Sequence, residues 1–312
     1  MTSLRWLVFF IVVPSVYAFA PRSLPSRVTS NLQMATSQQA FAGQTCVITG
    51  ASSGLGKSLA LALAECGAST LILSARSQER LEEVQRECQD RCQSITVHCI
   101  TADLSQPESV NLLTKQTLAK VASIDLFIHC GGVSSRSRFL DTTLEVDQQL
   151  MQINFFSGAA LCKAFVPKMP QGSRIIWISS VQGLMGLPNR SSYAASKFAV
   201  QGYCESIRAE LALDQQISVH CISPGYINTN LSQSAITGSG KTYGITDATT
   251  AAGADANDVA KEILTKVAAG SVDFTVAATL SARVAIWLRF LCPALLRYSL
   301  LKRYEKSKVK SD

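Results

Sequence analysis

The sequence predicts a single α/β domain in which a seven-stranded parallel sheet is doubly wound, with helices covering both of its faces. Three observations lead to this fold class. Seven short apolar runs recur within residues 43–280, and amphipathic segments lie between most of them. A glycine-rich turn follows the first run and opens a helix. With 312 residues, 47% of them apolar, the chain is long enough to bury one large core of this kind.

The strands are expected, in chain order, at Thr45–Thr49, Thr70–Ser74, Ile95–Thr101, Ile124–Cys130, Arg174–Ser179, Ile217–Ile222 and Asp273–Ala277. Helical patterns cover 76–91, Leu144–Met169 and Tyr193–Leu213. In such a sheet a ligand is expected at the carboxyl ends of the strands. Residues 226–256 interrupt the alternation and are rich in Gly, Ser, Thr and Ala. We interpret them as a lid or binding loop, with a passive surface insertion as the alternative.

Residues 1–42 are expected to be a targeting segment. Arg5 precedes the apolar stretch Trp6–Val13, and Val16-Tyr17-Ala18 fits the small-residue rule for a cleavage site. The stretch that follows contains Ser, Thr and Arg but no acidic residue, and the combination resembles the two-part plastid presequences of algae. Plastid import is therefore predicted. The alternative is an uncleaved anchor, residues 4–19, in the endoplasmic reticulum membrane.

Residues 281–312 are expected to be a basic amphipathic tail. They hold eight Lys or Arg against two acidic residues, and no apolar run reaches the ~20 residues that span a membrane. Trp287, Phe290 and Leu291, flanked by basic residues, suit a helix that lies in a membrane interface. Docking of this helix on the body or on a second copy is the alternative.

Charge and cysteine content argue against two other classes of site. The net charge is +7, but residues 43–280 hold 18 basic and 20 acidic residues, so no nucleic-acid partner is predicted. The ten cysteines include no Cys-x-x-Cys pair, and the three histidines lie in strand-like runs. We therefore expect reduced, mostly structural cysteines and no metal site.

Tyr193 and Lys197 are four residues apart and thirteen or more residues after Ser180, which ends an apolar strand. On a helix this spacing puts the ammonium beside the phenol. A nearby cation favours the ionised form of a phenol, whose pKa is otherwise near 10. Ser180 would offer a hydroxyl to the same oxygen of a substrate. The three residues predict a site that moves a proton on and off a carbonyl or alcohol oxygen.

A place for a hydride carrier is predicted at the glycine-rich turn. Gly50, Gly54 and Gly56 form a TGxxxGxG pattern between a strand and a helix. Glycine permits close approach of the backbone to a pyrophosphate, which then rests on amides at the helix N-terminus. By itself the pattern is also compatible with an ordinary strand–turn–helix.

Together these motifs resemble the short-chain dehydrogenase/reductase family over residues 43–279. The family resemblance rests on TGASSGLG, Asp103-Leu104, Asn154, Ser180, Tyr193-x-x-x-Lys197 and Pro224-Gly225, in the family's order. Within the family, residues 135–169 and 193–211 most resemble the member 7 and 7B subgroup. It implies a Rossmann fold and a catalytic set of Asn154, Ser180, Tyr193 and Lys197, with Ser179 as the alternative serine. It also implies a nicotinamide site that includes Gly50, Ser52, Gly54, Leu55, Gly56, Asp103, Gly132, Pro224, Gly225, Ile227 and Thr229, together with Tyr193 and Lys197.

Arg76 points to the kind of nicotinamide cofactor. It ends the second predicted strand, where an acidic residue would bind the ribose hydroxyls of NAD and a cation accommodates the 2′-phosphate of NADP. NADP(H) is therefore predicted, with Ser52 as a second phosphate contact. One departure from the family pattern is His129-Cys130-Gly131-Gly132, where Asn-Asn-Ala-Gly is usual. Gly132 is retained, but the hydrogen bonds of the two amide side chains are lost or replaced by His129.

The predicted function is NADPH-dependent reduction of a carbonyl on a lipophilic substrate, or the reverse oxidation of an alcohol. The subgroup resemblance suggests a lipid ketone such as 1-acyl-dihydroxyacetone phosphate, with retinoid, sterol or sphingoid ketones as alternatives. A non-catalytic NADP(H)-binding sensor or partner protein is the rival from another class. The family resemblance also implies a homodimer or homotetramer, formed through the segments Leu144–Met169 and Tyr193–Leu213.

Overall fold

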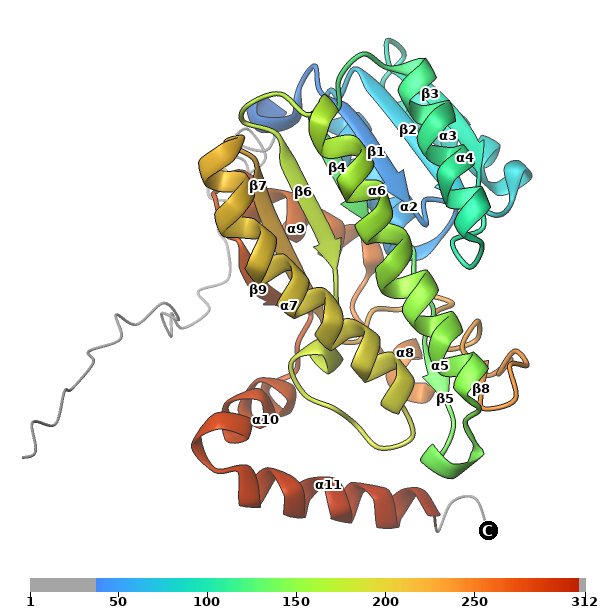
Figure 1. The fold of residues 1–312 in the computed structure, drawn as a ribbon, viewed down its shortest axis with the longest axis vertical. Helices are drawn as coiled ribbons and strands as arrows, with labels where there is room; N and C mark the ends of the chain where they lie inside the picture. The colour runs from blue at the N-terminus through green and yellow to red at the C-terminus, as the bar shows by residue number, and fades with distance from the viewer. Residues whose placement is uncertain (1–37, 309–312) are drawn as a thin grey trace, which may run out of the picture.

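The computed structural model describes residues 38–308 and contains the predicted seven-stranded parallel sheet (Figure 1). Its strands are β1 (Thr45–Thr49), β2 (Thr70–Ala75), β3 (Thr96–Thr101), β4 (Leu126–His129), β6 (Arg174–Ile178), β7 (Ser218–Pro224) and β9 (Asp273–Val276). All seven predicted strands are confirmed to within three residues at their ends. The prediction of a targeting segment falls mostly on residues outside the described range. Phe41, which precedes β1, is fully buried in the core.

The strand order is β3-β2-β1-β4-β6-β7-β9, and every neighbouring pair is parallel. The chain builds outward from β1 in one direction and then, from β4 onward, in the other. The connections that follow β1 and β4 leave the sheet toward opposite faces, which opens a crevice at the carboxyl ends of these two strands. The predicted position of a ligand site is therefore present in this fold.

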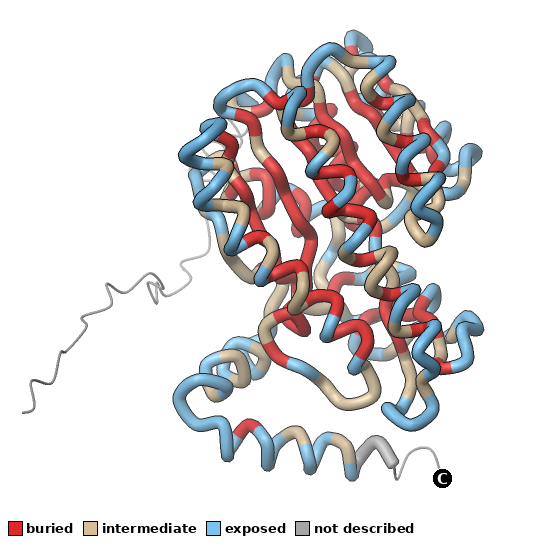
Figure 2. The backbone as a smooth tube through the Cα atoms, in the orientation of Figure 1, coloured by how far each residue is buried: buried red, intermediate tan, exposed pale blue. Residues whose placement is uncertain are grey.

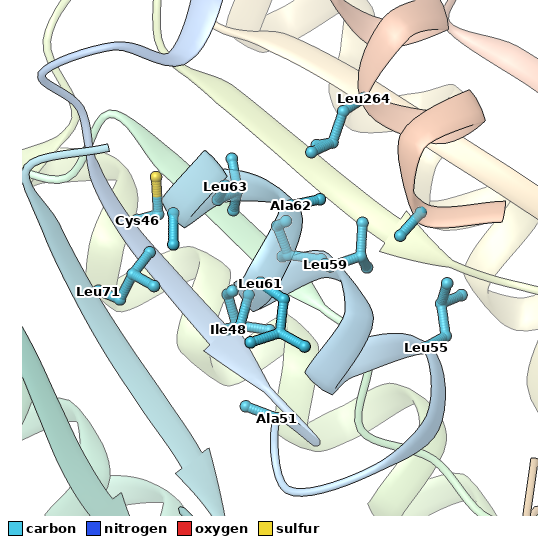
Figure 3. Close-up of a cluster of buried hydrophobic side chains, with 14 of the residues drawn as sticks. Cys46, Ile48, Ala51, Leu55, Leu59, Leu61, Ala62, Leu63, Leu71 and Leu264 are labelled. Atoms are coloured by element: carbon cyan, nitrogen blue, oxygen red, sulfur yellow. The ribbon is translucent and has the colours of Figure 1, made fainter. Parts of the chain in front are cut away.

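Helices cover both faces of the sheet. One face carries α2 (Gly54–Glu65), α3 (Gln78–Arg91) and α9 (Ala256–Ala268), and the other carries α4 (Pro107–Lys120), α6 (Ser157–Phe165) and α7 (Ser191–Asp214). Figure 2 shows the helices on the near face buried toward the sheet and exposed on their outer sides, whereas α2 is buried along almost its whole length. Figure 3 shows the hydrophobic core on the face covered by α2, α3 and α9, in which Leu59 and Leu63 of α2 lie between the sheet and Leu264 of α9. The apolar strands are thus buried on both sides, as their composition predicts.

The segment Leu144–Met169 is helical in the structure, but it is not one regular helix. It consists of α5 (Leu144–Met151), a π-helical turn (Gln152–Phe156), α6 and a final 3₁₀ turn (Val166–Lys168). Single π turns inside helices are often found at functional sites, because the extra residue re-aims the side chains that follow. Here the turn contains Asn154, which is fully buried.

Residues 226–256 lie at the carboxyl-end edge of the sheet. Within them, β8 (Ile236–Thr237) pairs in parallel with β5 (Ser135–Arg136) to form a second, two-stranded sheet, and α8 (Ala248–Ala251) follows. The pairing joins segments a hundred residues apart, and local periodicity did not predict it. It places Ile236 of β8 against Val146 and Leu150 of α5, beyond the carboxyl-end edge of the main sheet (Figure 1).

The tail forms two helices, α10 (Leu280–Leu291) and α11 (Pro293–Lys308), beyond the same edge of the sheet (Figure 1). In the part of α10 and α11 whose side chains are described, most large apolar side chains are exposed, among them Phe290 and Leu291 at 70% and 77%. Within residues 38–308, no helix combines the length and apolar character needed to cross a membrane.

Candidate active site

A cleft of about 900 Å³ opens at the carboxyl ends of the strands, where the fold places its crevice. It is lined by the glycine turn after β1, by the ends of β2, β4, β6 and β7, and by much of 226–256. Of the residues predicted for the site, all line this cleft except Asn154, which lies directly behind it. The structure therefore brings together residues spread over more than 170 positions of the chain.

The glycine turn has the backbone shape that glycine alone adopts without strain. Gly50 and Gly54 have φ angles of +69° and +52°, in the left-handed region. A Cβ atom on Gly56 would collide with the carbonyl oxygen of Gly50, so the start of α2 packs closely on the turn. The Ser53 side chain makes no capping hydrogen bond to α2. The first amide groups of this helix thus face the cleft without a side-chain cap, which suits them to bind a pyrophosphate.

Tyr193 and Lys197 lie on the inner face of α7, and both are buried. The ammonium lies 5.8 Å from the centre of the Tyr193 ring, and its Nζ donates a 2.8 Å hydrogen bond to the carbonyl of Ile178 at the end of β6. Ser180 follows β6, and its hydroxyl lies close enough to the Tyr193 phenol to lower the pKa of that phenol. The helical spacing of Tyr193 and Lys197 is confirmed, because both lie within α7.

The structure also distinguishes the two adjacent serines. The Ser179 hydroxyl donates to the carbonyl of Lys197 at 3.2 Å and accepts a hydrogen bond from Gln201 at 3.2 Å, so its hydrogen-bonding capacity is used inside the protein. The Ser180 hydroxyl accepts from the amide of Gln182 and meets the Tyr193 phenol. Ser180 is therefore the serine whose hydroxyl is near the Tyr193 phenol and is not fully engaged inside the protein.

Burial acts on the protonation of both ionisable groups. It raises the pKa of Tyr193, while the hydrogen bond with Ser180 and the charges of Arg190 and Arg136 lower it. Burial also lowers the pKa of Lys197 to about 8. Burial thus favours the neutral forms of both Tyr193 and Lys197. The positive charges near the phenol therefore decide how easily it ionises.

Asn154 holds the wall behind the cleft. Its amide nitrogen donates to the Val133 carbonyl and to the Ser196 hydroxyl, both at 2.9 Å, and its oxygen accepts from the Val133 amide at 2.8 Å. A Cβ atom on Gly132 would lie 3.1 Å from that oxygen and 3.5 Å from Nζ of Lys197. Glycine at position 132 therefore leaves room for the Asn154 amide and the lysine to approach each other.

The remaining predicted residues lie along the rest of the cleft. Arg76 follows β2 and is exposed at the rim, and Arg80 of α3 lines the cleft close by in sequence. Asp103 follows β3, and its Oδ1 accepts from the Ser105 amide at 2.9 Å, which is a capping role for one of its oxygens. Ser52, Leu55, Pro224, Gly225, Ile227 and Thr229 line the cleft on its other side or at its floor.

At the end of β4, where the sequence departs from the family pattern, Thr49 of β1 makes the contacts that join the two strands. Its Oγ1 lies 3.0 Å from Nδ1 of His129 and accepts the Gly131 amide at 3.1 Å. The His129 ring packs on Trp177 with the ring centres 4.8 Å apart. Burial first, and then the charge of Lys197, lower the pKa of His129 to about 3. A neutral histidine thus supplies the link between β1 and β4.

Sequence reasoning missed three charged residues near Tyr193: Arg136, Arg190 and Asp247. The two arginines line the cleft and both form ion pairs with Asp247. Arg190 lies three residues before Tyr193, and this spacing could have identified it. Arg136 and Asp247 meet only because β5 and β8 pair, so no local pattern signals them.

Comparison with known proteins agrees with this geometry. A family model described as short chain dehydrogenase matches residues 44–239. A dehydrogenase/reductase SDR family member 7B of Danio rerio is 43% identical over 273 residues, covering 85% of this chain and 87% of the relative. A dehydrogenase/reductase SDR family protein 7-like of Anopheles gambiae is 40% identical over 296 residues, covering 92% of each chain.

Solved structures share the fold at lower identity. A short chain dehydrogenase/reductase from Burkholderia phymatum in complex with NAD is 20% identical with a TM-score of 0.70, and the match covers 80% of this chain and 94% of that one. A short-chain dehydrogenase from Sphingobium yanoikuyae in complex with NADPH is 21% identical with a TM-score of 0.63, covering 86% and 96%. With the fold, the motifs and the relatives in agreement, this chain belongs to the short-chain dehydrogenase/reductase family of oxidoreductases.

Proposed function

We propose that this protein is an NADPH-dependent oxidoreductase that reduces a carbonyl, or oxidises the matching alcohol, on a lipophilic substrate. The observation that carries the proposal is the buried group of Ser180, Tyr193 and Lys197 in the wall of a cleft that also contains the glycine turn. A bound nicotinamide supplies the hydride that such a reduction adds to the carbonyl carbon. The protein's own part is to orient the carbonyl oxygen and to deliver a proton to it.

Each residue has a defined part in the proton transfer. The Tyr193 phenol donates its proton to the carbonyl oxygen in reduction and removes a proton from the alcohol in oxidation. The Ser180 hydroxyl orients the same oxygen through a hydrogen bond. Lys197 offers positive charge to the phenolate and hydrogen bonds to a ribose, while Asn154 fixes the backbone at Val133 behind it.

The preference for NADP(H) is proposed from the rim of the cleft. Arg76 and Arg80 lie where the ribose end of a dinucleotide is expected, after β2. Among the described residues that line the cleft, Asp103 is the sole acidic one, and it follows β3 rather than β2. Two guanidiniums without a facing carboxylate suit a 2′-phosphate better than a bare ribose diol, whose hydroxyls would find no carboxylate to donate to.

A lipophilic substrate and a membrane surface are proposed from the tail. Phe139, Pro188, Leu296 and Leu300 line an open apolar groove between α11 and the body. Arg289 of α10 donates to the Leu184 carbonyl at 2.8 Å and lies 4.5 Å from the centre of the Phe198 ring, which ties the tail both to the segment between Ser180 and Tyr193 and to α7. Apolar side chains among basic ones then suit the interface of an anionic membrane beyond the carboxyl-end edge of the sheet.

Two further proposals concern the whole protein. From residues 1–42 we propose plastid import, which a fluorescent fusion of this segment tests: labelling of the endoplasmic reticulum would contradict it.

From the helices α5 to α7 we propose association into a homodimer or homotetramer, since the large apolar side chain of Phe156 is 51% exposed there.

The central experiment compares wild type with Tyr193→Phe, using NADPH and a panel of lipid and small ketones. Loss of the phenolic proton should lower kcat/KM by roughly 100- to 10,000-fold while NADPH binding is retained. Tyr203→Phe, on the same helix but outside the cleft, is the matched control and should keep its activity. Tight NADPH binding by wild type with no turnover of any ketone would instead favour a non-catalytic binding protein.

A further inference from the structure

Two arginines occupy the part of the cleft near Tyr193. Arg136 belongs to β5, and Arg190 is the residue immediately before α7. Both line the cleft, yet their side chains are only 10% and 13% exposed. Charged side chains are rarely buried to this extent unless a partner neutralises them.

One carboxylate serves both guanidiniums. Arg136 donates to Oδ2 of Asp247 through Nε at 2.9 Å and Nη2 at 2.6 Å, and Arg190 donates to the same oxygen through Nη2 at 3.2 Å. Asp247 itself is not among the residues that line the cleft. Among the described residues, Asp247 is the acidic partner of both arginines. The two positive charges at the cleft are therefore offset by one negative charge, which leaves the cluster with a net charge of +1.

Several hydrogen-bonding groups of this cluster also lack a partner among the described residues. Arg136 has further partners in the Ser134 hydroxyl and the Ser135 carbonyl. Within the described part of the chain, Arg190 makes the single hydrogen bond to Asp247, so most of the five N–H donors of its guanidinium have no protein acceptor. The Tyr226 hydroxyl, which is buried in the wall of the same cleft, likewise has no partner among these residues.

We propose that Arg136 and Arg190, with the Tyr226 hydroxyl, bind an anionic group of the substrate, a phosphate or a carboxylate, while its carbonyl lies at Tyr193. Planar guanidiniums match the oxygens of either group and can bind them through paired hydrogen bonds. The substrate class is then a lipophilic ketone, or the matching alcohol, with an acidic group near the reacting carbon. This inference rests on the proposed carbonyl reduction, because it takes Tyr193 as the position of the reacting oxygen.

A purely architectural role makes a different expectation. If the arginines only latch residues 226–256 to α7 through Asp247, their loss should impair every substrate alike. If they bind an anion, their loss should weaken the substrates that carry one. The ratio of kcat/KM for an anionic ketone to that for a neutral one separates the two roles, since general damage to the protein cancels in the ratio.

The experiment uses the full chain and three ketones with the same acyl chain, bearing a phosphate monoester, a carboxylate or a neutral methyl ester. Wild type should prefer at least one of the two anions over the ester, and which one identifies the group. Arg190→Gln should lower that preference at least tenfold, chiefly through KM of the anionic ketone, and Arg190→Lys should restore part of it. Arg138→Gln, which removes an exposed arginine paired with Asp141 outside the cleft, is the control.

Two outcomes would overturn the proposal. One is a wild type that shows no preference for either anion, and the other is an equal loss for anionic and neutral ketones in Arg190→Gln. If no ketone is turned over at all, the proposed reduction fails, and calorimetry on the NADPH-loaded protein then decides the anion site by itself. Tighter binding of an anionic ketone by wild type, lost in Arg190→Gln, would support it, and equal binding would refute it.

Discussion

At Tyr193, burial and neighbouring charge act in opposite directions on the phenol. Burial raises its pKa, and Ser180, Arg190 and Arg136 lower it. Tyr193, Lys197 and Ser180 could be predicted from sequence because helical spacing and a strand end place them locally. The two arginines could not, because their approach to the phenol depends on β5, β8 and the start of α7 meeting in space.

Replacement of Arg76 by Asp tests the cofactor preference. The carboxylate should repel a 2′-phosphate and accept hydrogen bonds from the ribose hydroxyls of NADH. We expect the ratio of kcat/KM for NADPH to that for NADH to fall roughly a hundredfold, since a charged hydrogen bond contributes about 1.5–3 kcal/mol. The same exchange at Arg86, an exposed residue of α3 outside the cleft, should leave the ratio unchanged. An unaltered ratio in Arg76→Asp would contradict the preference.

His129 predicts a specific acid sensitivity. Its pKa of about 3 in the folded protein lies below the ordinary value near 6.5, so between these values the unfolded chain binds a proton that the folded protein does not. Stability is therefore complete above pH 6.5 and declines as the pH falls toward 3. From pH 7 to pH 5 this residue alone should remove about 2 kcal/mol from the free energy of unfolding.

The variant His129→Asn isolates this contribution. It removes the titrating group while retaining a side chain that can hydrogen-bond to Thr49. Its unfolding free energy, measured by denaturant titration, should decline less than that of wild type over the same pH interval, whatever its stability at pH 7. Parallel curves for the two proteins would show that His129 titrates normally.

At the scale of elements, all seven strands of the main sheet followed from apolar runs, but the interruptions did not. The predicted helix at 144–169 contains a π turn at Gln152–Phe156, which orients Asn154 toward Val133 and Ser196. Residues 226–256 were interpreted as a lid or binding loop, and in the structure they line the cleft. A π turn and a two-residue strand pairing depend on contacts with distant segments, so periodicity in one segment carries no sign of them.

The helices α10 and α11 carry a prediction about membrane binding. Phe290 and Leu291 are 70% and 77% exposed. Acidic residues at these positions should therefore leave the stability of the folded protein unchanged but oppose insertion of the helices among lipids. Each substitution, Phe290→Glu or Leu291→Glu, should weaken binding to phosphatidylserine-containing vesicles roughly tenfold or more, given about 1.5–3 kcal/mol for a buried side chain. Sedimentation with vesicles measures the effect.

A matched control for the tail substitutions is an exposed leucine near the C-terminal end of α7. Leu213 is 85% exposed and distant in sequence from α10 and α11, so Leu213→Glu should leave vesicle binding unchanged. Binding that is equal for all three variants and wild type would argue that α10 and α11 dock on protein instead.

For the molecule as a whole, the doubly wound sheet explains where the site is. The predicted cofactor residues line one cleft at the carboxyl-end edge of the sheet, and the tail lies beyond that same edge (Figure 1). The body carries little net charge, while basic residues concentrate in the terminal segments. The cleft, the residues proposed to act in catalysis and the proposed membrane surface are thus gathered at one end of the protein.

The amino-acid sequence by itself determined the strands, the glycine turn and the Tyr193–Lys197 pair, because strand, turn and helix are encoded by spacings of a few residues. The tertiary structure alone decided which serine meets Tyr193 and how Thr49 and His129 join two strands. It also decided that Arg136 and Arg190 converge on Asp247 beside the phenol. Such convergence arises from contacts between segments up to 111 residues apart, for which the linear sequence has no repeating signal.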